Sequence, residues 1–188
     1  MKRWFGRTLG LGVTLSLGLL PGGYSRAQEA PAGPPSREKL ESAARELIGT
    51  QKFCALVTVD PSGQPHIRTM NPFPPEEDMS VWMATNDRSR KVSEIKQNPR
   101  VTLYYGNHFE AVGYVALSGK AELVADRAEI LKRKRDYWDS AFPGLQHLVL
   151  IKVVPDRLEV VYYKEGLSGD PQTFRAPAVD LTPPAPKD

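Results

Sequence analysis

The sequence predicts a mainly β domain, of the all-β or α+β class, in which six or seven antiparallel strands form a barrel with peripheral helices. Three observations support this fold. Short apolar or alternating segments recur along the chain, the turn signal Asp60-Pro61-Ser62-Gly63 separates two of them, and glycines interrupt the longest. Few segments have helical spacing of apolar residues, so the helices are expected outside the sheet.

The N-terminal part of the domain is predicted to be a helix followed by a hairpin. The helix is expected from Arg37 to Ile48, because Ser36 is a favourable N-cap, apolar residues recur on one face and Gly49 can end it. The hairpin should form about the Asp60–Gly63 turn, whose proline and glycine suit a tight turn. Its strands are expected at residues 53–59 and 65–70.

The segments that follow complete the predicted barrel. Gly113 and Gly119 divide the longest apolar segment and would allow the sheet to curve there. The Pro-rich residues 71–75 are predicted to be a rigid loop. Strands are expected at residues 79–84, 101–105, 111–124, 148–154 and 158–163. One helix is expected to begin near Ser89, with Asp87 or Ser89 as its N-cap, and to end at Asn98-Pro99. Another helix is expected from Asp126 to Trp138.

The first 27 residues differ in composition from the rest of the chain. Three basic residues precede an apolar stretch from Leu9 to Leu20, and the sequence Ser25-Arg26-Ala27 follows. This pattern is typical of a secretory signal peptide cleaved after Ala27, with an uncleaved anchor as the alternative. The sequence therefore predicts an exported protein, periplasmic or secreted, with no stable membrane span after cleavage.

The remaining chain is long enough for one domain with a single core. Residues 28–36, rich in Ala, Pro and Gly, are predicted to be a linker, and residues 37–163 to be the domain. Residues 164–188 form a C-terminal extension, and four prolines in 176–188 predict a partly disordered tail.

The charge of the mature chain does not favour a nucleic-acid partner. The sequence has 25 basic and 22 acidic residues, and removal of the four basic residues of the first 27 leaves 21 against 22, a net charge of −1. The basic tract Lys132–Arg135 is surrounded by acidic residues and is predicted to be a solvated helix face. We therefore expect no nucleic-acid binding.

The cysteine and the histidines show no metal-site pattern. Cys54 is the single cysteine, and its apolar neighbours predict a small buried side chain on a strand. His66, His108 and His147 are far apart and lack HxxxH or HExxH spacing, so no metal is expected. An isolated histidine such as His108 could still serve as an axial haem ligand.

The segment from Thr85 to Lys91 is the strongest candidate for a binding site. It places three cations and two hydroxyl groups where a strand passes into a helix. Arg88, Arg90 and Lys91 oppose the helix macrodipole there, and a bound anion would remove the conflict. Backbone N–H groups, hydroxyls and a guanidinium are the donors that a phosphate monoester needs. The alternative is an ordinary solvated turn with surface charges.

Several short motifs follow one another in a recognisable order. They are Asp60–Pro65, Arg68-Thr69-Met70, Trp82–Asn86 running into Ser89-Arg90-Lys91, Asn98–Val101, Ser118–Ala121, and Tyr137-Trp138 followed by Phe142-Pro143-Gly144. Together, over roughly residues 36–163, they resemble the pyridoxamine 5'-phosphate oxidase-like FMN-binding split barrel family, and within it the general stress protein 26 branch.

The resemblance implies which residues would contact FMN. One group would bind the phosphate, a second would lie along the isoalloxazine ring, and a third would lie beside the ribityl chain or ring edge. The group at the phosphate is Arg68, Lys91, Ser89 and Arg90. The group along the isoalloxazine ring is Thr69 and Met70, and the group beside the ribityl chain or ring edge is Thr85 and Asn86. Tyr114 stands on the strand where the oxidase branch usually carries a flavin-contacting Gln, and it could stack or hydrogen-bond instead. The resemblance also implies a homodimer with FMN at the interface.

The function expected on this basis is that of an exported FMN-binding flavoprotein, a small-molecule oxidoreductase whose flavin carries the electrons. No catalytic residue is nominated. No Arg-x-His substrate signature follows residues 158–163, so pyridoxamine phosphate is not the expected substrate. The alternatives are a non-catalytic protein that binds flavin, haem or a deazaflavin on the same barrel, and a cofactor-free dimeric scaffold.

Overall fold

The computed structural model describes residues 33–182, and its main feature is an antiparallel sheet of seven strands. The predicted signal peptide, most of the predicted linker and residues 183–188 lie outside the described residues. The strands are β1 (Cys54–Val59), β2 (Pro65–Met70), β3 (Val81–Asn86), β4 (Arg100–Gly106), β5 (Gly113–Val124), β6 (Leu148–Tyr162) and β7 (Ala178–Asp180).

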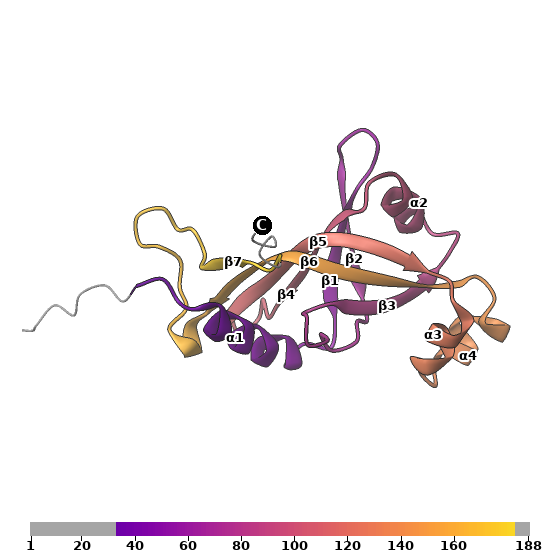
Figure 1. Ribbon diagram of the computed structural model, residues 1–188, viewed down its shortest axis with the longest axis horizontal. Coiled ribbons are helices and arrows are strands. Elements are labelled where there is room, and N and C mark those ends of the chain that lie inside the picture. The colour runs from indigo at the N-terminus through magenta and orange to yellow at the C-terminus, as the bar shows by residue number, and fades with distance from the viewer. Residues whose placement is uncertain (1–32, 183–188) are drawn as a thin grey trace, which may run out of the picture. The chain divides into compact units, whose positions relative to one another are not determined.

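The sheet curls into a half-barrel that is split between its two edge strands. The strand order is β2-β1-β4-β5-β6-β3, and β7 pairs with β6 outside this path. The two edges meet at an isolated bridge between Pro72, which follows β2, and Met83 in β3. Figure 1 shows β5 and β6 running side by side across the sheet. The predicted mainly β fold with peripheral helices is therefore confirmed.

Four helices lie beside the sheet in the described part of the chain. Ser36 caps the first of them as predicted, because its hydroxyl accepts from the Lys39 N–H at 3.3 Å. This helix packs on β4, β5 and β6, and the second packs on β1 and β5. The helices are α1 (Arg37–Gly49), α2 (Arg90–Gln97), α3 (Arg127–Lys132) and α4 (Trp138–Ala141), with short 3-10 turns η1 (Pro143–Leu145) and η2 (Tyr163–Glu165).

Two hydrophobic clusters hold these elements together. The larger fills the inside of the half-barrel and includes Cys54, which is buried as predicted. The smaller lies outside β3, where Trp82 packs with Trp138 of α4. β3 is therefore buried on both faces instead of alternating, and it begins two residues later than predicted. Thr85 and Asn86 consequently belong to the end of the strand.

The predicted strands 148–154 and 158–163 form one continuous strand, which corrects the sequence analysis. Pro155 does not end β6, because it lies opposite Gly119 at the irregularity between Ser118 and Gly119 in β5. A Cβ at Gly119 would lie 2.1 Å from the Val154 carbonyl oxygen, so glycine allows this close approach. The predicted bend at Gly119 is confirmed, and it is what accommodates the proline.

The predicted helix 126–138 is wrong as a single element, since it divides into α3 and α4. The prediction of a solvated face for the basic tract is also wrong for two of its four residues. The Arg133 guanidinium lies 3.8 Å from the centre of the Trp82 ring, and that of Arg135 lies 3.9 Å from the centre of the Phe73 ring. These cations cover apolar surface, so helical periodicity does not describe the segment.

The C-terminal extension contributes to the sheet. β7 pairs with Arg157–Glu159 of β6, and Leu181 is buried in the main core, features that the prediction of a loosely ordered tail did not include.

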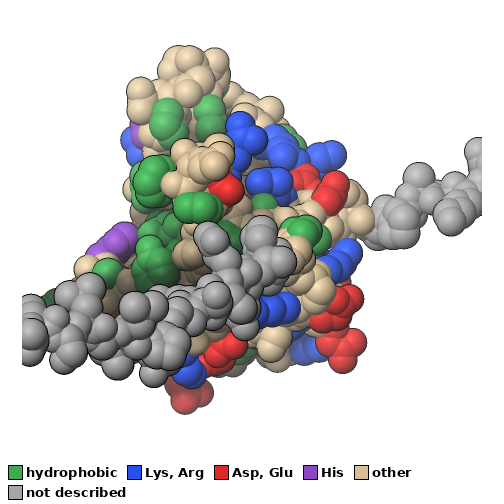
Figure 2. Space-filling model, turned by 90° about the vertical axis from the view of Figure 1, so that its left-hand side faces the viewer, with side chains coloured by type: hydrophobic (Ala, Val, Ile, Leu, Met, Phe, Trp, Pro, Cys, Tyr) green, Lys and Arg blue, Asp and Glu red, His purple; other side chains and the backbone are tan. Residues whose placement is uncertain are grey.

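Seen from the end of the molecule shown in Figure 2, hydrophobic side chains occupy the middle of the surface, with Lys and Arg groups beside them. In the described residues, none of the helices has the length and apolar character that a membrane crossing requires.

Candidate functional site

The start of α2 lies at the end of β3, as the sequence predicts for an anion site. Ser89 is the N-cap residue, but its hydroxyl makes no capping hydrogen bond. Its oxygen is buried without a hydrogen-bond partner among the described residues. Asn86 accepts instead from the Arg88 N–H at 2.9 Å. An unpaired buried hydroxyl at a helix N-terminus is a donor that a bound anion would satisfy.

Arg68, Thr85 and Lys91 converge at this helix start. Arg68 comes from β2, Thr85 from β3 and Lys91 from α2, so the cluster joins both edges of the split sheet. The Lys91 ammonium donates to the Thr85 hydroxyl at 2.9 Å. Burial and the nearby Arg68 guanidinium lower the pKa of Lys91, against the opposing effect of Glu94. The two cations therefore repel each other, and an anion bound beside them would relieve this repulsion.

Glu94 is a central residue of the site that the sequence analysis missed. It is only 3% exposed and accepts from the Thr58 hydroxyl and from Arg68 Nη2, the latter at 2.9 Å. Its other carboxylate oxygen lies 3.1 Å from Arg90 Nε and 3.7 Å from His66 Nε2. Burial opposes ionisation of Glu94, but the bonds from Thr58 and Arg68 outweigh it and lower its pKa. The i, i+4 spacing of Arg90 and Glu94 was the available sequence signal.

The charges of this cluster suit a phosphate monoester. Arg68, Arg90 and Lys91 carry three positive charges, and Glu94 carries one negative charge, which leaves an excess of two. A phosphate monoester carries about −1.5 to −2 at pH 7. A phosphate monoester bound here would therefore neutralise the cluster and supply acceptors for its free donors.

The remaining predicted cofactor residues are not all brought to the cluster. Thr69 and Met70 follow each other on β2 and point to opposite faces, because Thr69 is exposed and Met70 lies in the core. The Tyr114 hydroxyl donates to Glu159 at 2.8 Å, and its ring stacks on Tyr104 with centroids 5.4 Å apart. Burial and the contact with Glu159 raise the pKa of Tyr114 to about 12.

The three histidines have different neighbours in the structure. His66 and His147 contact Asp60 and Asp87 at 3.1 and 3.2 Å, and His108 stacks on Tyr104 with ring centroids 5.8 Å apart. The described residues contain no group of three or more His, Cys, Asp or Glu that could hold a metal ion.

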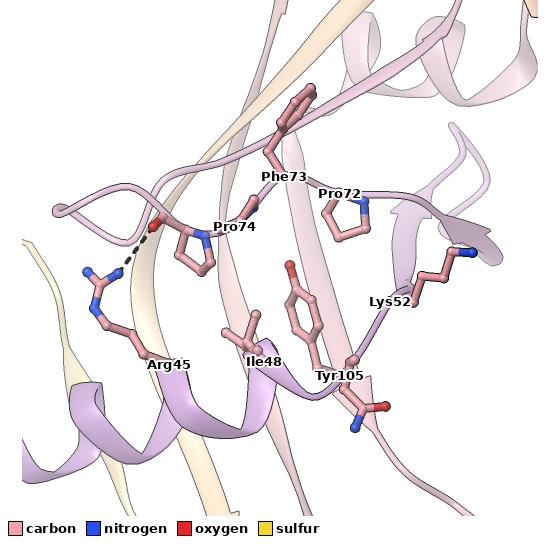
Figure 3. Close-up of a pocket in the computed structure, with 10 residues that line it drawn as sticks. Arg45, Ile48, Lys52, Pro72, Phe73, Pro74 and Tyr105 are labelled. Atoms are coloured by element: carbon pink, nitrogen blue, oxygen red, sulfur yellow. Dashed lines mark hydrogen bonds between the residues drawn. The ribbon is translucent and has the colours of Figure 1, made fainter. Parts of the chain in front are cut away.

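A separate cavity of about 330 Å³ lies between the end of α1 and the loop after β2. Figure 3 shows Ile48 and the Tyr105 hydroxyl pointing toward Pro72 and Pro74, with Arg45 bonded to a loop carbonyl. None of the predicted FMN residues lines this cavity. Its concave shape therefore does not identify the phosphate site, which rests on the donors at the start of α2.

Comparison with known proteins supports the fold. The family model for Pyridoxamine 5'-phosphate oxidase matches residues 40–162, which include both edge strands and α2. The chain is 26% identical to general stress protein 26 of Bacillus subtilis (strain 168) over 134 residues, 67% of this chain and 91% of the relative. The structure of general stress protein 26 from Bacillus anthracis str. Sterne has a TM-score of 0.56 at 26% identity, covering 65% of this chain and 93% of that one.

Two further similar structures are of proteins named for different cofactors. One is a pyridoxamine 5'-phosphate oxidase-related, FMN binding protein from Nostoc punctiforme PCC 73102, with a TM-score of 0.53 at 17% identity, covering 79% of this chain and 98% of that one. The other is a heme binding protein from Mycobacterium smegmatis, with a TM-score of 0.57 at 14% identity, covering 78% and 59%. At these identities the likeness concerns the fold alone, which this chain shares with a protein named for FMN binding and with one named for heme binding.

Proposed function

The chain belongs to the pyridoxamine 5'-phosphate oxidase family, and we propose that it is an FMN-binding member that acts as a small-molecule oxidoreductase. The observation that carries the proposal is the cluster at the start of α2. There the Arg68 and Lys91 cations lie near each other, and the hydroxyl of the N-cap residue Ser89 is buried without a hydrogen-bond partner among the described residues. The family has FMN-binding and haem-binding members, and this donor set suits a phosphate, which FMN carries.

In this proposal the residues of the chain bind and orient the cofactor. Arg68 and Lys91 hold the phosphate, while Arg90 and the Ser89 hydroxyl add donors at the helix end. Thr85 holds the Lys91 ammonium in place through the 2.9 Å contact. When bound, FMN would carry the electrons, so the proposal does not require a catalytic acid or base among the side chains of the protein.

A homodimer is part of the proposal, and the outer face of the sheet supports it. Cross-strand partners on this face form two uncharged rows over four strands. They are Ile67, Val57, Thr102 and Ser118, and Thr69, Ala55, Tyr104 and Ala116. Ile67 is 69% exposed. A partly exposed, uncharged sheet face is a surface that a second copy could cover.

Export is proposed from the N-terminal sequence, which has basic, apolar and small-residue segments in the order of a signal peptide. Mass spectrometry of the protein recovered from the producing cells tests this part directly. A mature chain that begins at Gln28 is expected, and an intact N-terminus in the cytoplasm would contradict export.

The cofactor is tested by titrating the purified protein with FMN and with riboflavin, which lacks the phosphate, and following flavin fluorescence. We expect FMN to bind more tightly. Lys91→Ala should weaken FMN binding by about tenfold to 100-fold, the range for a lost charge-assisted hydrogen bond. The control is Lys96→Ala, an exposed cation in the last turn of α2, which should bind as wild type.

Equal affinity for FMN and riboflavin, or normal FMN binding by Lys91→Ala, would overturn the phosphate site. A haem protein would give a different pattern, with a haem absorption band that is lost in His108→Ala and unaffected by Lys91→Ala. A cofactor-free scaffold would bind neither group.

A further inference from the structure

The Arg68 guanidinium is fixed by a closed ring of hydrogen bonds. Nη1 donates to the Thr58 hydroxyl, Nη2 donates to Glu94, and Thr58 donates to the same Glu94 oxygen. Nη1 also donates to the His66 carbonyl at 3.1 Å. Thr58 is fully buried and Glu94 is 3% exposed, so water does not compete for these contacts.

In the described part of the chain, the ring leaves one edge of the guanidinium free. A guanidinium is planar and has five N–H donors, of which these contacts use three. Nη1 and Nη2 donate to Thr58 and Glu94, so the edge of the guanidinium that the two Nη atoms form is occupied. The donors that remain are Nε–H and the second Nη2–H, which lie on the side edge of the group. Two parallel donors on one edge match two oxygens of a phosphate.

A negative charge next to a phosphate site requires an explanation, because it repels the ligand. If Glu94 were only a counter-charge for the cations, its neutralisation would strengthen phosphate binding. If it orients Arg68, neutralisation would replace the charge-assisted hydrogen bond to the guanidinium with a weaker neutral one, and binding would weaken although the site becomes more positive. The two roles predict changes of opposite sign.

We propose that Glu94 and Thr58 are positioning residues that aim the side edge of Arg68 at the phosphate for bidentate contact. This inference rests on the proposed FMN function. The buried hydrogen-bond ring supports a positioning role, since a counter-charge would not need the Thr58 hydroxyl. The repulsion between the Glu94 carboxylate and the phosphate is offset because the two free donors of Arg68 are held in a fixed direction.

The test compares Glu94→Gln, Thr58→Val and Thr58→Ser with the wild type in titrations with FMN and riboflavin. Thr58→Val keeps the side-chain shape and the charge of the site but removes the hydroxyl, whereas Thr58→Ser restores it. We expect Glu94→Gln and Thr58→Val each to weaken FMN binding by about fivefold to tenfold, the effect of one hydrogen bond. Riboflavin affinity should not change, and Thr58→Ser should bind FMN as wild type. Thermal unfolding checks that each variant is folded.

Tighter FMN binding by Glu94→Gln would overturn the inference and identify a counter-charge. Unchanged FMN binding by Thr58→Val would overturn it as well, and this variant remains informative if Glu94→Gln does not fold. These outcomes differ from failure of the proposed function, in which the wild type itself would not distinguish FMN from riboflavin.

Discussion

Glu94 keeps its negative charge inside the protein because two hydrogen-bond donors meet it there. Burial opposes the charge, and the Thr58 hydroxyl and the Arg68 guanidinium reverse that effect, so the folded pKa lies below the ordinary value of 4.5. A carboxyl with a lowered folded pKa stabilises the protein above its unfolded pKa. This contribution is lost as the pH falls through the folded value.

We therefore expect the stability difference between wild type and Glu94→Gln to depend on pH. Near pH 7 the variant should be less stable by about 2 kcal/mol, as for a lost hydrogen bond to a charged group. Below pH 4.5 the difference should shrink, because the carboxyl of the unfolded wild-type chain binds a proton there before that of the folded protein does, and the contribution is lost once the pH falls through the folded pKa. Urea unfolding at several pH values measures both quantities, and a constant difference from pH 7 to pH 3 would contradict the assignment.

At the level of residues, the sequence predicted that Arg68 and Lys91 come together but not the carboxylate that binds Arg68. Arg68 and Lys91 are about twenty residues apart, and their convergence followed from placing both at strand ends. The role of Glu94 was missed because an acidic residue on a polar helix usually faces solvent. Its burial depends on how α2 packs against β1, which carries Thr58, and local sequence does not contain that information.

The segment from Lys132 to Arg135 attaches the α3–α4 region to the rest of the fold. Arg133 is 12% exposed, lies over the Trp82 ring and pairs with Glu76 at 2.8 Å. We expect Arg133→Ala to lower the unfolding free energy by about 1–2 kcal/mol through the lost cation–π contact and lost packing. Lys132→Ala is the matched control, because Lys132 is 69% exposed.

Chemical denaturation of the two variants separates these effects. A change within about 0.5 kcal/mol is expected for the control, as for most surface substitutions. Equal effects of the two substitutions would show that the basic tract is a solvated face after all.

Two glycines provide a second comparison at the level of elements. A Cβ at Gly119 would meet the Val154 carbonyl oxygen at 2.1 Å, whereas a Cβ at Gly49 would meet no heavy atom of the described residues within 4 Å outside its chain neighbours and its own helix backbone. Gly119→Ala must therefore separate β5 from β6 and should cost about 3 kcal/mol, the upper part of the range for overpacking. Gly49→Ala, in the last turn of α1, should stabilise by about 0.5–1 kcal/mol.

Thermal unfolding of both glycine variants gives opposite signs if the close approach at Gly119 is real. A loss of stability in both would contradict the open space at Gly49, and a loss in neither would contradict the contact in the sheet.

The elements that the sequence predicted well are those with strong local signals. The Ser36 cap and the Asp60–Gly63 turn gave α1 and the β1–β2 hairpin nearly to the residue. The errors arose where a distant segment changes the local preference. Pro155 continues through β6 because Gly119 lies opposite it, and β3 loses its alternation because α4 covers its outer side.

The proposed homodimer links the whole molecule to the site. β2 carries Arg68 toward the phosphate cluster, and on its other face it carries Ile67, a member of the uncharged rows that is 69% exposed. An interface on the outer face would therefore lie on the opposite side of β2 from the cofactor site. In a symmetric dimer each residue contributes twice, so one introduced charge places two charges in the interface.

Ile67→Glu is accordingly expected to convert the dimer to a monomer and, because the partner would complete the FMN pocket, to weaken FMN binding. Leu131→Glu is the control, since Leu131 is 51% exposed on α3 and outside the uncharged rows. Sedimentation equilibrium gives the oligomeric state, and the FMN titration gives the coupling. If Ile67→Glu remained dimeric, the interface would lie on another face. If it became a monomer with normal FMN affinity, each chain would bind the cofactor alone.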